Sequence, residues 1–296
     1  MDLAITASIL AFCAAVAFRL CQRYSLHHPR LAQIAAVCCL ITATYLSWTS
    51  TYNLAWAEIL PHGSTLFLSN ASLLLVIVAA GLIFGDPRIS TSRKQAVTII
   101  FAVTAFAGIG SVLFRPLVQP LLLAADGEWK EDVCLQTHEA SCAPAAAATL
   151  LGKYGVDTTE KEMAIHCLTS GNGTLSLAAF RGIHVGARRT GLGARAFVRE
   201  PSTKSIDEHL PLFALVDFEI QLSASRAASS GPAAYGGNAS ESSPRKSKEG
   251  RHAVVLLERL KDGQYLVADP AVGKVRWTEE YFRHIWVGEG IYLVSK

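Results

Sequence analysis

The first 115 residues contain four long runs of apolar residues separated by shorter polar stretches. These runs cover 3–18, 31–48, 66–84 and 96–113. Each is close to the roughly 17–25 residues that an α-helix needs to cross a lipid bilayer. The pattern therefore predicts an N-terminal membrane domain, residues 1–115, with a bundle of about four transmembrane helices.

Basic residues are distributed unevenly between the loops that join these runs. The second loop, 49–64, contains no Lys or Arg, whereas the first and third loops contain Arg19, Arg23, Arg30, Arg88, Arg93 and Lys94. The positive-inside rule places the two basic loops in the cytoplasm. We therefore expect an integral membrane protein of the bacterial inner membrane, with the chain after the fourth run extracytoplasmic. The first run has no basic segment before it and no small-x-small cleavage site, so we expect an uncleaved helix.

After a linker at 116–132, the apolar positions predict three helices. The first begins at Cys142, the second follows the capping box formed by Thr159 and Glu162, and the third covers about 175–185. Short runs typical of β-strands come next, with helical pieces between some of them. The strand-like runs cover 194–198, 212–218, 253–260, 265–268, 274–277 and 290–294, and the helical pieces cover 205–209 and 279–285. Helices followed by an antiparallel sheet predict an α+β domain over 133–296.

A stretch rich in Ser, Ala and Gly, 221–249, interrupts the predicted sheet. Its composition cannot bury enough apolar surface to offset the entropy of ordering, so we expect a disordered insertion. Across all 296 residues, 51% are hydrophobic and 17% charged, with a mean hydropathy of +0.30. This is apolar for a soluble protein and fits a membrane part joined to a soluble part. The net charge of +3 and the lack of a basic, aromatic-rich cluster argue against nucleic-acid binding.

Cys142 is the strongest candidate for a reactive side chain. Pro144 follows it by two residues and leads into an Ala- and Leu-rich run, which indicates a helix with Cys142 in its first turn. The unpaired N–H groups and the positive end of the helix dipole stabilise an anion there and lower the pKa of a thiol. A small buried thiol at a helix start is the structural alternative.

His252 and Asp269 are the residues that favour catalysis at Cys142. His252 begins one predicted strand and Asp269 ends the next, so a tight hairpin would bring the two side chains together. A thiolate, a histidine and a carboxylate that orients the histidine form the usual set of nucleophile, base and orienting group. Asp217 is the other candidate for the orienting carboxylate, but it lies within a predicted strand and lacks the Asp-Pro turn.

The motifs also resemble a known family. The residues that carry the resemblance are Gln136 six residues before Cys142, Tyr154-Gly155, Gly173-Thr174, His252-Ala-Val-Val and Asp269-Pro270. They are similar to the double-glycine peptidases, papain-like cysteine peptidases that process bacteriocin precursors. The resemblance covers about 133–296. It implies Cys142 as nucleophile, His252 as base, Asp269 as orienting group and Gln136 as the side-chain donor of the oxyanion hole. Ala143 stands where the family usually has Gly.

The resemblance implies a peptide or protein substrate cleaved at a Gly-Gly-type site, and no cofactor. The chain contains no G-x4-G-K-[ST] sequence, so a transporter partner would be a separate protein, alongside the lipid bilayer. Two other functions remain open at this point. A papain-like module could bind peptides with little or no catalysis, which Ala143 favours, or the same triad could serve an acyl transferase or amidase.

Three of the seven cysteines lie in the predicted soluble domain: Cys134, Cys142 and Cys167. In an oxidising compartment an odd number suggests one disulfide and one free thiol. With Cys142 as nucleophile, Cys134 and Cys167 are the remaining pair. A zinc site formed by Cys134, His138 and Cys142 is an alternative, but it lacks the usual Cys-x2-Cys spacing and an obvious fourth ligand.

Overall fold

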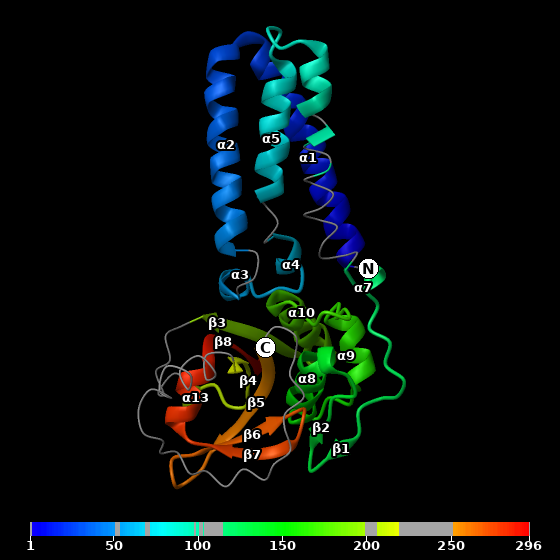
Figure 1. Cartoon of the computed structure of the whole chain (residues 1–296), viewed down its shortest axis with the longest axis vertical. Helices are drawn as coiled ribbons and strands as arrows, with labels where there is room; N and C mark the ends of the chain where they lie inside the picture. The colour runs from blue at the N-terminus through cyan, green and yellow to red at the C-terminus, as the bar shows by residue number, and fades with distance from the viewer. Residues whose placement is uncertain are drawn as a thin grey trace, which may run out of the picture. The chain divides into compact units, whose positions relative to one another are not determined.

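The computed structural model describes residues 2–50, 54–68, 72–97, 99–100, 103, 115–198, 206–218 and 251–295. The chain divides into two compact units, which are described separately (Figure 1). The first consists of Met1–Trp56 and Ser64–Val118, and the second of Ala57–Gly63 and Gln119–Lys296. The predicted insertion at 221–249 lies outside the described residues.

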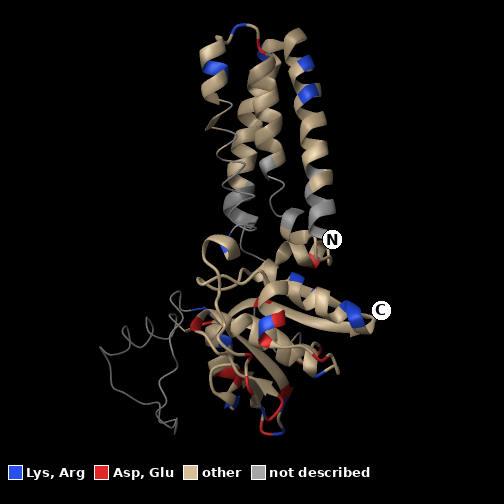
Figure 2. Cartoon of the chain, turned by 90° about the vertical axis from the view of Figure 1, so that its right-hand side faces the viewer, with Lys and Arg blue, Asp and Glu red and all other residues tan. Residues whose placement is uncertain are grey.

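The first unit is helical. Its elements are α1 (Asp2–His27), α2 (Pro29–Ser50), α4 (Thr65–Leu68), α5 (Ser72–Gly85) and α7 (Arg115–Val118), and α3 (Ala55–Ile59) begins in it. Charged residues are sparse along α1, α2 and α5 (Figure 2). Helix α5 packs against both α1 and α2. A Cβ at Gly85 would lie 2.2 Å from the Gln22 carbonyl oxygen, so glycine permits the close approach of α5 to α1.

The prediction of four transmembrane helices is not supported. Within the part of the chain that the structure describes, no helix is both long enough and apolar enough to cross a membrane. The third predicted run, 66–84, includes most of α4 and α5. The 14 residues of α5 extend about 21 Å, against a hydrocarbon core of about 30 Å. The fourth run, 96–113, falls mostly outside the described residues.

The second unit contains an antiparallel sheet of six strands in the order β3-β8-β4-β5-β6-β7. The strands are β3 (Leu192–Val198), β4 (Leu212–Asp217), β5 (Arg251–Arg259), β6 (Tyr265–Asp269), β7 (Gly273–Trp277) and β8 (Trp286–Ser295). A separate two-stranded ribbon pairs β1 (Trp129–Lys130) with β2 (Val133–Cys134). Strand β8 is longer than the predicted 290–294 because it pairs with β3 along one edge and with β4 along the other.

Helices and short 3₁₀ turns complete this unit. They are η1 (Glu139–Ser141), α8 (Cys142–Gly152), α9 (Glu160–His166), α10 (Ser176–Ala187), η2 (Arg188–Thr190) and α13 (Glu279–Ile285). Helix α8 packs on β5 and against α9 and α10. A core of buried apolar side chains from β4, β5, β6, β8 and α13 forms the centre of the unit. The α+β class and the antiparallel sheet predicted from the sequence are confirmed.

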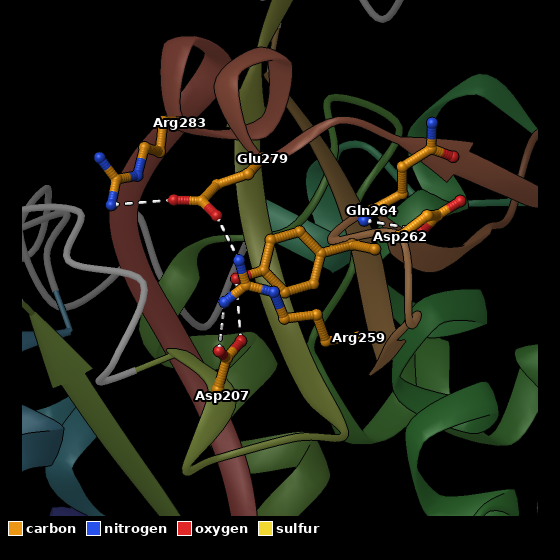
Figure 3. A network of polar contacts seen from close by, with 7 residues as sticks. Asp207, Arg259, Asp262, Gln264, Glu279 and Arg283 are labelled. Carbon is orange, nitrogen blue, oxygen red and sulfur yellow. Dashed lines mark hydrogen bonds and ion pairs between the residues drawn. The ribbon is translucent and has the colours of Figure 1, made fainter.

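A network of ion pairs fixes α13 to the edge of this core. The Arg259 guanidinium lies between Asp207 and Glu279, at 2.6 and 2.5 Å (Figure 3). The Tyr265 hydroxyl donates to the other Asp207 oxygen at 2.9 Å. These bonds connect the end of β5 with the first residue of α13, so the network stabilises the fold on which the candidate site is built.

Candidate active site

Helix α8 presents Cys142 at its first position. The turn η1 leads directly into the helix, and Pro144 lies in the first helical turn, where its missing N–H has no cost. Ala143 to Leu151 are buried, so the helix is held inside the domain while Cys142 remains partly exposed. The thiol therefore lies at the positive end of a firmly packed helix.

His252 and Asp269 come from neighbouring strands of the sheet. His252 is the second residue of β5 and Asp269 the last residue of β6, and each is less than a tenth exposed. The His252 Nε2 and the Asp269 Oδ1 are 2.8 Å apart. The other ring nitrogen remains for the Cys142 thiol, which is in hydrogen-bonding contact with the imidazole. The structure thus joins Cys142, His252 and Asp269 in one chain of contacts.

Burial and hydrogen bonding act in opposite directions on this pair. Burial raises the pKa of Cys142, but the hydrogen bond and charge of His252, with the backbone N–H groups of Ala253 and Ala143, bring that pKa below its ordinary value. Burial lowers the pKa of His252, but hydrogen bonds to Asp269 and Cys142 outweigh it and raise the pKa to about 10. Both shifts favour a thiolate beside an imidazolium, the reactive form of a nucleophilic cysteine.

The turn after β6 holds the Asp269 carboxylate in place. Oδ1 accepts a second hydrogen bond from the Ala271 N–H at 2.9 Å. The Pro270 carbonyl accepts the Gln136 N–H at 2.8 Å, so the turn is connected to the segment that precedes Cys142. Asp217, the other candidate for the orienting carboxylate, instead pairs across the sheet with Arg251, and His252 makes its ion pair with Asp269.

Gln136 lies between β2 and the η1 turn. Its side-chain Nε2 donates to the His138 carbonyl at 3.1 Å, which leaves a second amide hydrogen for another acceptor. Its Oε1 is buried and accepts no hydrogen bond within the described residues. His138 is itself exposed, and its Nδ1 accepts the Ala140 N–H at 3.0 Å, which fixes the turn before Cys142.

An aromatic side chain that the sequence analysis did not single out covers His252. The Phe218 ring lies 5.7 Å from the His252 ring, centroid to centroid, with Trp277 packed edge-on against Phe218 at 6.4 Å. The pairing register of β4 with β5 could have identified Phe218 as a neighbour of His252. Val216 is the cross-strand neighbour of His252, and alternate residues of a strand share a face, so Phe218 lies on the same face as His252.

The sequence left Cys134 and Cys167 as the remaining pair for a disulfide, but both are free thiols with different surroundings. Cys167 packs against α10, where a Cβ at Gly182 would lie 2.2 Å from its sulfur. Burial raises the pKa of both thiols to about 12 and keeps them protonated. Within the described residues no group of three or more His, Cys, Asp or Glu side chains could hold a metal ion, which leaves the zinc alternative without support.

Residues 130–220 match the peptidase C39 family. Solved structures that are similar to part of this chain include a double-glycine-motif protease from an AMS/PCAT transporter in complex with the leader peptide. Its identity is 19% and its TM-score 0.39, covering 59% of this chain and 97% of that chain. The peptidase domain of Streptococcus ComA, a bifunctional ABC transporter, is similar at 18% identity and a TM-score of 0.39, over 55% and 98% of the two chains.

A third similar structure is the peptidase C39-like domain of a toxin-secretion ATP-binding protein from Vibrio parahaemolyticus, at 12% identity and a TM-score of 0.34, over 53% and 98%. No curated protein sequence matches the chain. The family match contains Cys142 and Gln136 and ends before His252 and Asp269, which the sheet brings to the same place. Residues 130–220, which contain Gln136 and Cys142, are therefore similar to the peptidase C39 family, and this match supports a cysteine peptidase.

Proposed function

We propose that this chain cleaves peptide bonds with Cys142 as nucleophile, His252 as general acid and base, Asp269 as the orienting carboxylate and Gln136 as an oxyanion donor. The observation that carries the proposal is the contact chain from Cys142 at the start of α8 through His252 to Asp269. The lowered pKa of Cys142 and the raised pKa of His252 match the thiolate and imidazolium that this chemistry uses.

The proposed reaction has two steps. The Cys142 thiolate adds to the peptide carbonyl carbon, and the oxyanion receives hydrogen bonds from the Gln136 amide and the Cys142 N–H. His252 gives its proton to the leaving amine as the C–N bond breaks, which leaves a thioester on Cys142. His252 then takes a proton from water, whose oxygen attacks the thioester and releases the acid and the thiolate. Asp269 holds Nε2–H throughout, so the other ring nitrogen faces the sulfur.

We propose a Gly-Gly-type site in a leader peptide as the substrate, and a separate transporter as a partner for the product. This rests on the family match and on the resemblance of the motifs. The replacement of the usual Gly by Ala143 does not oppose it. Ala143 is only 5% exposed, so its methyl group packs inside the domain. That burial leaves the non-catalytic binding module without a specific supporting observation.

Two substitutions test the catalytic proposal. The full chain is incubated with peptides that contain an internal Gly-Gly, and the products are mapped by mass spectrometry. Wild type should cleave after the second Gly, and Cys142→Ala should bind peptide without cleavage. Ser176→Ala, a change at the first residue of α10, is the matched control and should cleave normally. Equal cleavage by wild type and Cys142→Ala would exclude Cys142 as nucleophile.

We further propose that the helical unit anchors the peptidase domain to a lipid bilayer, with that domain on the extracytoplasmic side. Supporting this, large apolar side chains such as Phe12, Ile34 and Ile41 are more than half exposed on α1 and α2. In flotation with vesicles of bacterial lipids the full chain should rise with the vesicles. A chain that stays in the dense fraction would contradict anchoring, and labelling of the domain by an impermeant reagent in spheroplasts would test its side.

A further inference from the structure

Residues 134–138 approach Cys142 along a path in which every backbone N–H has a partner. Cys134 donates to the Thr149 hydroxyl at 2.9 Å, and Leu135 to the Glu128 carbonyl at 2.8 Å. The Gln136 N–H donates to the Pro270 carbonyl and the Thr137 N–H to the Glu160 carboxylate. The His138 N–H donates to the Ser141 hydroxyl at 3.1 Å. The partners come from several different elements, so the segment has a defined position relative to α8 and β6.

The Gln136–Thr137 dipeptide is held from two sides. On one side the Gln136 N–H donates to the Pro270 carbonyl in the turn after Asp269. On the other side the Thr137 N–H and hydroxyl donate to the two carboxylate oxygens of Glu160, at 2.9 and 2.8 Å. Among the described residues, Glu160 is thus the side chain that holds this dipeptide with two hydrogen bonds.

Glu160 is a buried charge. It is 0% exposed, at the first position of α9. A buried carboxylate has a high cost in free energy unless hydrogen bonds compensate it, and here each oxygen accepts one from Thr137. Gly127 packs closely against the carboxylate, because a Cβ at this position would lie 3.1 Å from the Glu160 Oε2 and 2.2 Å from the Leu135 carbonyl oxygen.

Glu160 also affects the neighbouring thiol. After burial, its charge is the next influence that raises the pKa of Cys134 to about 12. Because the Cys134 thiol stays protonated, it does not compete with Cys142 as a nucleophile. Glu160 is therefore surrounded by the neutral thiol of Cys134 and by tightly packed backbone, and its carboxylate accepts its hydrogen bonds from Thr137.

We infer that Glu160 is a positioning residue for the oxyanion donor: its carboxylate fixes Thr137, and through the backbone it fixes Gln136 relative to Cys142. The inference rests on the proposed function, since it assigns Gln136 to the oxyanion hole. Glu160 makes no contact with the reacting atoms. Its effect appears in the rate of the acyl-transfer step, because a donor misplaced by 1 Å costs on the order of 100-fold in rate.

The principal variant is Glu160→Ala in the full chain, assayed on a Gly-Gly peptide. We expect kcat to fall by about 10- to 100-fold with little change in KM, because the lost interaction is formed in the transition state. In a Gln136→Ala background the same change should alter kcat by less than about 2-fold, since the two residues act in series. Glu162→Ala is the matched control on α9, and should leave kcat unchanged.

Conservative substitution separates positioning by hydrogen bonds from an effect of charge. In Glu160→Gln the amide oxygen can accept the Thr137 N–H and the amide nitrogen can donate to the Thr137 hydroxyl, so both bonds survive. We expect kcat within about 3-fold of wild type. Thr137→Val removes only the hydroxyl bond and should lower kcat by about 5-fold. If circular dichroism shows that Glu160→Ala is unfolded, Thr137→Val is used in its place to test the inference.

Labelling of Cys142 by iodoacetamide distinguishes this role from a structural one. Alkylation displaces iodide at a saturated carbon and forms no oxyanion, so Glu160→Ala should label at the wild-type rate while cleaving slowly. Equal losses of labelling and cleavage in a folded variant would overturn the inference, as would full cleavage by Glu160→Ala. If wild type cleaves no peptide, the proposed function fails too, whereas normal wild-type cleavage with unaffected Glu160→Ala refutes only the role of Glu160.

Discussion

The coupling between Cys142 and His252 gives a quantitative prediction. Burial alone raises the pKa of Cys142, and contact with His252 is the main influence that lowers it below the ordinary value of 9.0. In His252→Ala the pKa should therefore return to about 9 or above. At pH 7 such a thiol is about 1% thiolate, and the lowered pKa of Cys142 gives the wild-type thiol a larger ionised fraction. A thiolate of higher pKa is intrinsically more nucleophilic, so the net loss in alkylation rate should stay below the roughly 100-fold limit set by a fully ionised wild-type thiol.

The assay measures alkylation of Cys142 by iodoacetamide between about pH 5 and pH 10, with mass spectrometry of the labelled peptide. The wild-type rate should level off above the lowered pKa of Cys142 and fall as pH drops through that pKa. The rate of His252→Ala should instead rise with pH toward about 9. Cys134 and Cys167 are internal controls, since they are buried with pKa values raised to about 12.

His284→Ala removes an exposed histidine of α13 and is the matched control, with an expected wild-type profile. If His252→Ala were labelled at the wild-type rate at neutral pH, the imidazole would not be responsible for the thiolate. The coupling described for Cys142 and His252 would then be refuted, and helix α8 alone would have to account for the reactivity.

Three further substitutions test other parts of the structure. Asp269→Asn should lower kcat by about 100- to 10,000-fold through loss of the imidazole orientation, and a loss below 10-fold would contradict its role. Gly182→Ala places a Cβ 2.2 Å from the Cys167 sulfur and should lower the free energy of unfolding by about 1–3 kcal/mol in a denaturant titration, most of which Cys167→Ala in the same chain should restore. Tyr265→Phe removes the bond to Asp207 and should cost about 0.5–1.5 kcal/mol without changing kcat; an altered kcat would show that this network reaches the site.

Most of the candidate site could be predicted from the sequence because short local motifs mark its residues. Pro144 marks the start of α8 and so places Cys142 in the first helical turn. The turn before Tyr265 and the Asp269-Pro270 pair define a hairpin, which explains why a histidine and a carboxylate seventeen residues apart meet at 2.8 Å. The strands of this region were predicted to within two residues for the same reason.

Other features depend on contacts between residues far apart in the sequence, which a local sequence pattern does not predict. Glu160 looks like an ordinary residue of a capping box, and its carboxylate is identified as an anchor for Thr137 only when α9 is packed on α8. The sequence could not decide whether Cys134 pairs with Cys167, because sequence separation says nothing about the distance between Cα atoms. The length of β8 was underestimated because its beginning is stabilised by pairing with β4, where Trp286 lies opposite Val216, rather than by its own pattern.

The central claim is that Cys142 attacks the substrate carbonyl. Its most direct test is intact-mass spectrometry of the full chain, rapidly quenched in acid after mixing with a Gly-Gly peptide. A mass increase equal to the acyl part of the peptide, mapped to Cys142, sensitive to hydroxylamine and absent from Cys142→Ala, is the expected result. Peptide that binds and is never acylated onto Cys142, or cleavage that proceeds with an adduct on another residue, would contradict the account.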